Sequence, residues 1–392
     1  MKEVSRGSTI HLKGITWNHT RGYLPMVATA QRFSEMNPNV RIAWETRSLQ
    51  DFADAPIQKL AHTFDLLVID HPFSGYAATH DVLVPLDECI TRKFLEDQAR
   101  NSVGHSHASY QAGGHQWALA IDAATPISGW RPDLLEQAHA SVPKTWSELL
   151  KLAKLGMVAL PAIAIDSLMN FYMFCGAQGE DPFSKRNKVV TEGIGIRALK
   201  MLQELVSLCG SECLYRNPIA TWELLSSSDT VAYCPFAYGY SNYSRTGYAR
   251  HVLQVGGLVE MDSGASLRST LGGTGLAISS RCQHTDIAAK YVEFVASEKC
   301  QRSIYFDSGG QPGQRKAWLD RSINRRNNNF FSATLPTLDA AFLRPTFYGY
   351  MHFQDLAGAV VHTYLKNGGK ERKVLYDLSR LYTEARKEEQ NG

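Results

Sequence analysis

Hydrophobic positions in the first seventy residues switch between two periods. Residues 10–17 and 40–45 carry them at the spacing of a β-strand. Residues 25–37 carry them at the spacing of a helix, which we expect Pro25 to open and Asn37-Pro38 to end. A second helix is predicted around residues 52–61, and residues 65–70 are apolar on both faces, as in a strand buried in a parallel sheet. This alternation predicts right-handed β-α-β crossovers in a layered α/β domain.

A second α/β section follows the first. Gln111 to Gly114 predicts a turn between extended segments, and Thr145-Trp-Ser-Glu148 is a capping box that begins a helix. We expect a strand at residues 160–165 and then a helix that Asp166 or Ser167 caps.

The rest of the chain continues the same alternation. Residues 191–209 predict a long amphipathic helix, and residues 231–234 predict a short strand that Pro235 halts. Residues 271–279 predict a further strand, and residues 351–387 predict a largely helical tail. No internal repeat or low-complexity linker occurs, so we expect several short crossings to join the two sections.

Composition narrows the class of protein. A chain of 392 residues predicts two or three domains, and a net charge of +3 without a basic block gives no electrostatic case for nucleic acid. No stretch approaches the roughly 20 apolar residues of a membrane helix. Met1 to Ser8 lacks the apolar region of a secretory signal, so a signal was either trimmed or never present. Seven scattered cysteines make no disulfide framework and favour a reduced compartment.

The Cys, His and Ser residues of the chain do not have the spacing that a metal site or a catalytic site requires. Cys209 and Cys213 have no second Cys or His pair at zinc-ligand spacing. His105 and His107 lie in a polar run, which is typical of solvated surface histidines. Ser308 has glycine on one side only, so it does not form a nucleophile elbow. The sequence therefore predicts no cofactor, no metal and no catalytic residue.

Polar and aromatic side chains instead gather just past the carboxyl ends of three predicted strands. Trp17, His19 and Arg21 follow the first strand, Arg47 follows the second, and Asp70 with His71 follows the third. In an open α/β sheet these ends form the ligand crevice. Aromatic faces suit the C–H groups of a sugar, and polar side chains suit its hydroxyls. The alternative for Trp17 is a place in the core, and each group alone reads as ordinary loop polarity.

Several segments in fixed order resemble a known family. They are residues 12–22, Phe33 to Val40, residues 64–70, Val84 to Asp87, Trp117 to Asp122, residues 272–277, Ala288 to Phe294 and residues 309–313. In this order they resemble the family 1 extracellular solute-binding proteins of bacterial ABC sugar importers, the maltodextrin-binding-protein class.

The resemblance implies a two-lobed, periplasmic-binding-protein-like α/β fold in which three hinge crossings join two layered lobes. The N-terminal lobe is expected to hold residues 1–120 and 272–311, and the C-terminal lobe residues 121–271 and 312–392. The implied partners are a small carbohydrate and the transmembrane subunits of an ABC permease, for a monomer in the periplasm or another extracytoplasmic space. The implied ligand-binding residues are Trp17, His19, Arg21, Arg47, Asp70, His71, Asp122, Asn170, Tyr172, Tyr238, Gly310 and Gln311.

Two other functions stay open at this point. The first is an enzyme on a related two-lobed fold that acts on a sugar through Asp70, Asp122 and His71. The second is a binding protein that serves a sensor instead of a permease. The sequence leaves the charge of the sugar open as well, because Arg21 and Arg47 favour an anionic substituent while the two aspartates can neutralise them.

Overall fold

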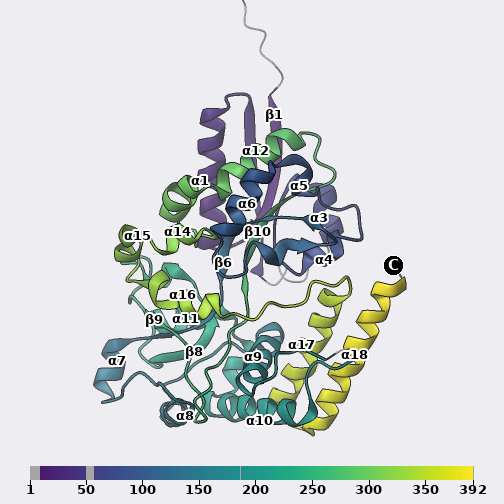
Figure 1. Cartoon of the computed structure of the whole chain (residues 1–392). Helices are drawn as coiled ribbons and strands as arrows, with labels where there is room; N and C mark the ends of the chain where they lie inside the picture. Colours follow the sequence, from purple (N-terminus) through teal and green to yellow (C-terminus); the bar gives the residue numbers. More distant parts are fainter. Residues whose placement is uncertain (1–8, 50–56, 186, 392) are drawn as a thin grey trace, which may run out of the picture. The chain divides into compact units, whose positions relative to one another are not determined.

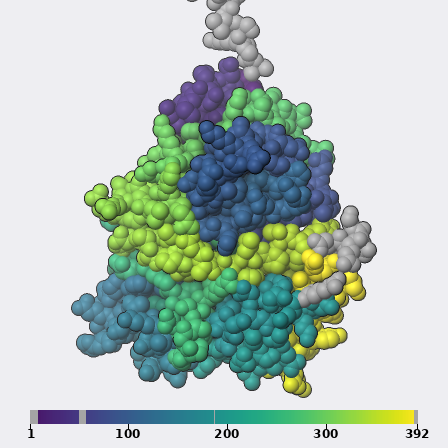
Figure 2. Space-filling view, viewed as in Figure 1, coloured from purple at the N-terminus to yellow at the C-terminus, as the bar shows by residue number. Residues whose placement is uncertain are grey.

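The computed structural model describes residues 9–49, 57–185 and 187–391 of the chain (Figure 1). Two compact units emerge, each made of two separate stretches of sequence. Unit 1 is Met1–Ala123 with Gly273–Asp320, and unit 2 is Ala124–Gly272 with Arg321–Gly392. Figure 2 shows this mixing at the surface of unit 1, where residues of the first hundred lie directly against the green segment near residue 290.

Unit 1 is built on a five-stranded sheet with the order β2-β1-β3-β10-β6. Its strands are β1 (Ile10–Trp17), β2 (Val40–Arg47), β3 (Leu66–Ile69), β6 (Leu119–Ala124) and β10 (Gly272–Ile278). β1 runs parallel to β2 and β3, and β10 runs antiparallel to β3. The three strands predicted in the first seventy residues and the strand predicted at 271–279 are confirmed. β10 is the antiparallel member because the chain enters it on its return from unit 2.

Helices cover this sheet, and hairpin β4–β5 (Gln111–Ala112 and His115–Gln116) lies at the predicted turn. The helices are α1 (Thr20–Met36), α3 (Ile57–Thr63), α4 (Phe73–Ala77), α5 (Leu86–Cys89), α6 (Arg92–Arg100), α12 (Thr285–Ala296), α13 (Glu298–Cys300) and α14 (Arg315–Trp318). The prediction that Pro25 opens the first helix is wrong. α1 begins at Thr20 because the ring of His19 accepts the Arg21 N–H at 3.0 Å, and Pro25 lies inside the helix. Part of the helix predicted around 52–61 lies outside the described residues.

The core of unit 1 closes over the end of β1. Trp17 is 3% exposed and packs with Met26 and Phe33 of α1. A methyl group on Gly22 would lie 2.4 Å from the Trp17 ring, so only glycine lets the first turn of α1 approach the indole. The strand end that carries the polar residues is thereby fixed against the core.

Unit 2 has a smaller sheet with the order β8-β7-β9, made of β7 (Pro126–Trp130), β8 (Tyr233–Tyr238) and β9 (Gln254–Gly256). The prediction that Pro235 halts the strand is wrong, because β8 continues through it to Tyr238. β8 is the edge strand of this sheet: it pairs with β7, and on its other side an isolated bridge joins Val158 to Tyr233. Pro235 follows that bridge, where a residue without a backbone N–H is tolerated.

The central helix of unit 2 is α9 (Ala164–Ala177), which is buried on nearly all its faces and packs against α10 and α17. The others are α7 (Pro132–Gln137), α8 (Trp146–Lys154), α10 (Glu192–Cys209), α11 (Pro218–Ser227), α15 (Arg321–Arg326), α16 (Phe330–Asp339), α17 (Tyr350–Asn367) and α18 (Glu371–Asn391). Figure 1 shows α17 and α18 side by side, and α17 packs on α9. The capping box at Thr145, the long helix ending at Cys209 and the helical tail are confirmed.

The strand predicted at residues 160–165 is wrong. This segment is an extended connection to which the structure assigns no strand, and its Ala162 N–H is shared between Cys213 O at 2.9 Å and Arg216 O at 3.2 Å. α9 then begins at Ala164, before either predicted capping residue. Asp166 falls inside its first turn, and the Ser167 hydroxyl donates back to Ala162 O at 2.7 Å.

Asp166 is a buried carboxyl group in the interior of unit 2. It is 4% exposed, and its Oδ2 has no hydrogen-bond partner among the described residues. Burial raises the pKa of Asp166 from 3.8 to about 8, because the charged form loses its hydration. Between these two pH values the folded chain holds a proton that the unfolded chain has released. Stability from this group is therefore complete below pH 3.8 and is lost as the pH rises to about 8.

The variant Asp166→Asn should remove this pH dependence. At pH 8 we expect it to raise the free energy of unfolding by about 1–3 kcal/mol relative to the parent, because no charge then has to be buried. Urea unfolding between pH 4 and 8 measures the effect. Asp286→Asn is the matched control, since Asp286 lies in the first turn of α12 and is exposed. A parent and variant with parallel pH profiles would contradict the prediction.

Candidate functional site

The carboxyl ends of four strands of unit 1 meet at one edge of its sheet. β1, β2 and β3 are parallel, so Trp17, Arg47 and Ile69 end at the same edge. Gly273 of β10 lies against Asp122 of β6, and Gly275 lies against Ala118, because a methyl group on either glycine would meet that residue. The residue numbers rise in one strand as they fall in the other, so β6 is antiparallel to β10 and therefore parallel to β3. This edge is where open α/β sheets bind ligands.

Arg21 and Asp122 form a buried ion pair at this edge. Arg21 Nε donates to Asp122 Oδ2 at 2.8 Å, and Arg21 Nη2 donates to Asp122 Oδ1. The two side chains are only 4% and 0% exposed. Burial raises the pKa of Asp122, whereas the charge of Arg21 and its hydrogen bonds oppose that rise. The bidentate geometry holds a guanidinium against a carboxylate in a place that water does not reach.

Residues 305–311, in the second stretch of unit 1, close around this pair. Gln311 Nε2 donates to Ala123 O at 2.7 Å, and Ala123 N donates to Gln311 O at 3.3 Å. Gly310 lies against Tyr305, since a methyl group there would meet the Tyr305 ring at 2.4 Å. Burial, and then the negative charge of Asp122, raise the pKa of Tyr305 far above its usual range, so its hydroxyl stays neutral.

His19 adds a neutral imidazole to the same edge. Burial, and then the charge of Arg21, lower the pKa of His19 to about 3. A neutral ring can accept at Nδ1, where the Arg21 N–H is bonded. His19 therefore positions the first turn of α1 and contributes no charge at neutral pH.

The ends of β2 and β3 carry the remaining polar groups of this unit. Arg47 is 9% exposed, and its Nη2 donates to Val68 O at 3.3 Å. The Asp70 carboxylate accepts the His71 N–H at 2.9 Å and lies 3.3 Å from His71 Nδ1. His71 is 1% exposed and meets Tyr110 edge to face. The sequence did not predict that Tyr110 packs against His71 or that Tyr305 packs against Gly310. The sequence signal for each was an aromatic residue close to a turn or to a glycine cluster.

The predicted residues of unit 2 differ in their surroundings. Asn170 donates from Nδ2 to Pro161 O at 3.0 Å, and Tyr172 packs edge to face on Phe183. Both are buried in α9. Tyr238 is half-buried at the end of β8, and its hydroxyl lies 3.0 Å from Thr270 Oγ1.

The structure thus groups nine of the twelve predicted residues in unit 1 and three in unit 2. Within unit 1 they present two guanidinium groups, two carboxylates, two imidazoles and an amide, which suit the recognition of hydroxyl groups. In the described part of the chain, no cluster of three or more His, Cys, Asp or Glu side chains could hold a metal ion. Burial also raises the pKa of Cys213 to about 11, which keeps that thiol protonated.

The ion pair gives a direct prediction. Asp122→Asn should lower the free energy of unfolding by about 3–5 kcal/mol, because Arg21 would remain as a buried charge without its counter-charge. Denaturant unfolding followed by tryptophan fluorescence measures the loss.

The double variant Arg21→Met/Asp122→Leu should recover most of that loss, since it removes both buried charges together. Glu35→Gln is the control: it breaks the exposed pair with Arg32, and the unfolding midpoint should not move. If Asp122→Asn is as stable as the parent, the pair does not organise this edge.

Solved structures of low sequence identity share this fold. The maltose-bound MalE3 protein of T. maritima is 17% identical with a TM-score of 0.82, over 96% of this chain and 100% of that one. A solute-binding protein of Agrobacterium radiobacter K84 in complex with ribitol is 18% identical with a TM-score of 0.80, over 97% and 99%. One from Thermotoga lettingae TMO bound with α-D-tagatose is 16% identical with a TM-score of 0.80, over 96% and 100%. These likenesses confirm the predicted two-lobed, periplasmic-binding-protein-like α/β fold.

Sequence comparison identifies the family. No curated protein matches the sequence. A family profile described as bacterial extracellular solute-binding protein matches residues 28–325, well over half of the chain. None of the helices in the described residues is both long enough and apolar enough to cross a bilayer. The chain belongs to the bacterial extracellular solute-binding protein family.

Proposed function

We propose that this protein is the substrate-binding subunit of an ABC importer. It binds one small carbohydrate or sugar derivative in a cleft between its two lobes, and the lobes close on the ligand about the three crossings of the chain. The closed, loaded form is then the one that the transmembrane permease subunits recognise. We place its action in the periplasm or another extracytoplasmic space, in keeping with its family, and expect it to act as a monomer.

The observation that carries this proposal is the polar edge of the unit 1 sheet. Proteins of the same fold are described with maltose, ribitol and tagatose, all rich in hydroxyl groups. The proposed ligand-binding residues remain the twelve of the sequence prediction. Among them, half-buried Tyr238 supplies the aromatic face from unit 2, whereas Trp17 and Tyr172 support the walls from the two cores.

The charges at this edge favour a neutral ligand. Arg21 is already neutralised by Asp122, and His19 is uncharged at neutral pH. Arg47, which donates to Val68 O, adds one positive charge, and Asp70, beside His71, adds one negative charge. Together with the Arg21–Asp122 pair these side chains sum to no net charge. A neutral sugar or polyol satisfies such groups through its hydroxyls without adding a charge that would need a new partner.

The protein is proposed to bind without catalysis. In the rival enzyme, Asp122 would serve as an acid or a base, yet both of its oxygens accept hydrogen bonds from Arg21. A role with a sensor in place of a permease would use the same ligand site. Identification of the membrane protein that co-purifies with the loaded form separates these two roles.

Calorimetry against a panel of sugars and polyols tests the proposal. We expect one saturable site per chain, and a ligand at 100 times its dissociation constant should stabilise the folded state by roughly 2.7 kcal/mol. Glucitol and gluconate form a matched neutral and anionic pair, and the neutral member should bind more tightly if either binds.

Chromatography of the bound sugar after long incubation is the accompanying control. Release of a hydrolysed or oxidised product would refute the non-catalytic role. Failure of every neutral sugar and polyol to shift the melting temperature would refute the carbohydrate ligand.

A further inference from the structure

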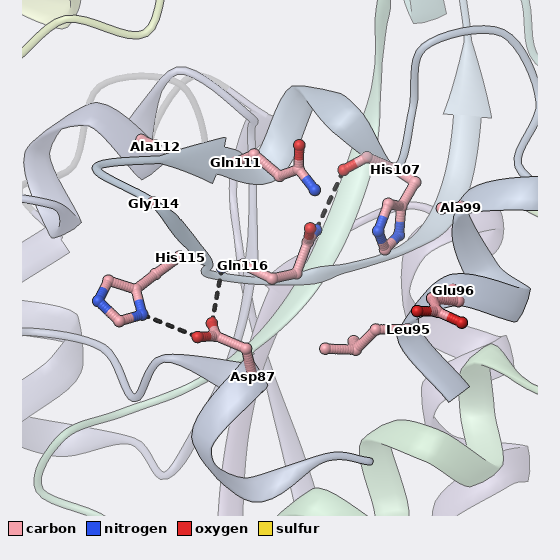
Figure 3. A pocket seen from close by; sticks show the side chains of 10 residues that line it. All are labelled: Asp87, Leu95, Glu96, Ala99, His107, Gln111, Ala112, Gly114, His115 and Gln116. Carbon is pink, nitrogen blue, oxygen red and sulfur yellow. Dashed lines mark hydrogen bonds and ion pairs between the residues drawn. The ribbon is translucent and has the colours of Figure 1, made fainter. Parts of the chain in front are cut away.

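Unit 1 contains a pocket of about 500 Å³ between hairpin β4–β5 and helices α5 and α6 (Figure 3). The expectation of a solvated surface histidine is wrong for His107, which lines this pocket and is 5% exposed. The Asp87 carboxylate accepts from Gln116 N at 2.8 Å and lies 2.9 Å from His115 Nδ1. The polar groups of this pocket thus hold the hairpin against α5.

A pocket of a different character lies along helices α17 and α18 of unit 2, which Figure 1 shows side by side. Its volume is about 490 Å³. The lining comes from residues within 356–364 of α17, from the loop 368–370 and from residues within 373–381 of α18. None of them is among the residues proposed to bind the sugar, so a ligand here is independent of that proposal.

The floor of the α17–α18 pocket is apolar. Leu356, Ala359 and Val360 have the spacing i, i+3 and i+4, which places them on one side of α17. Leu356 is 40% exposed although its side chain is large and apolar. On α18, Val374 and Leu381 are 7% and 8% exposed, and the helix rises about 10 Å between them. An extended alkyl chain fits along such a floor.

The charges of the lining leave one cation without a counter-charge. Lys373 Nζ lies 2.9 Å from Asp377 Oδ2, and Arg380 Nη1 lies 2.8 and 2.9 Å from the two carboxylate oxygens of Glu384. Lys370 is exposed, and no ion pair or hydrogen bond joins its ammonium to another residue in the ranges 9–49, 57–185 and 187–391. A single positive charge therefore remains, at the loop end of the apolar floor.

The loop leaves the approach to Lys370 open. Gly368 and Gly369 have φ angles of 73° and 138°, which favour glycine. A methyl group on Gly369 would lie 4.0 Å from the Tyr364 ring, so no side chain closes over this point. Glu371, the neighbouring carboxylate in the sequence, accepts from the Tyr364 hydroxyl at 3.2 Å and does not line the pocket.

We propose that the α17–α18 pocket binds a free alkyl carboxylate of the fatty-acid class. The chain lies on the apolar floor, where its burial supplies most of the affinity, and the carboxylate accepts a charge-assisted hydrogen bond from Lys370. An alkylammonium would meet Lys370 as a like charge, and an alcohol would lose the charge-assisted bond. A small anion without a chain would lose the contact with the floor.

Titration with octanoate, octanol and octylammonium tests the proposal, because the three probes share one chain and differ in charge. The methyl resonances of Val360 and Val374 in the full chain report on the floor. Octanoate should shift them saturably, with a dissociation constant of about 1 mM. Octanol should bind about fivefold more weakly and octylammonium more weakly still. Decanoate should bind about tenfold more tightly than octanoate, since it buries two further methylenes.

Lys370→Gln is the decisive variant, because the Lys370 side chain is exposed and its loss leaves the core intact. It should abolish the preference for octanoate over octanol and leave the affinity for octanol unchanged. Arg372→Gln is the matched control: it removes a cation that pairs with Glu192 at 2.9 Å and does not line the pocket, so the preference should survive.

Leu356→Asn tests the floor and should weaken all three probes about threefold to fivefold. Tyr376→Asn, on a residue that is 68% exposed and outside the lining, is its control and should change nothing. Octylammonium binding as tight as that of octanoate, a preference that survives Lys370→Gln, or no saturable shift would each overturn the proposal. So would co-sedimentation with phosphatidylglycerol vesicles that depends on Lys370 while octanoate causes no shift, since this would assign the face to an anionic bilayer.

Discussion

The organisation of unit 1 depends on one buried ion pair. Arg21 and Asp122 are separated by 101 residues in sequence, yet they share two hydrogen bonds in a place that excludes water. A lone charge there would be unstable, so the first turn of α1 and the end of β6 have to occupy fixed positions relative to each other. Asp122 also directly precedes the residue at which the chain first leaves unit 1. The pair thus fixes both the edge of the sheet and the place, after Ala123, where the chain passes from unit 1 to unit 2.

The other groups at the edge follow from that constraint. Gln311 holds the backbone of Ala123, so the second stretch of the unit is bound to the residue beside the pair. Gly310 packs against Tyr305, whose ring leaves no room for a side chain at position 310. The paired charges of Arg21 and Asp122, the neutral ring of His19 and the Gln311 amide make this edge polar without giving it a large net charge.

Much of the fold was predictable because its signals are local. The doubly apolar run 65–70 could only be a central strand, and the capping box at Thr145 marks a helix start by itself. The errors fall where distant residues decide the outcome. Whether Pro235 ends a strand depends on the position of β8 at the edge of its sheet. Whether residues 160–165 form a strand depends on a partner strand beside them, and the described structure assigns none.

The site shows the same division. Strand ends could be found from the sequence, so Arg21, Arg47 and His71 were predicted to share an edge. The burial of each side chain could not be predicted, because nothing in the sequence around Tyr172 and Tyr238 shows that the first is buried within α9 and the second half-buried at the end of β8. The pocket beside His107 was invisible for the same reason: it arises from the packing of a hairpin on two helices.

The position of β10 in the sheet has a consequence for how the chain is made. β10 lies between β3 and β6, yet it is synthesised about 150 residues after β6. Until it emerges from the ribosome, the apolar edge of β3 has no neighbour on that side and is open to pairing with other chains. Unit 1, although it contains the N-terminal residues, therefore completes its folding only after most of unit 2 has been translated. The unpaired edge of β3 is therefore a site of aggregation risk in the nascent chain until β10 has been made.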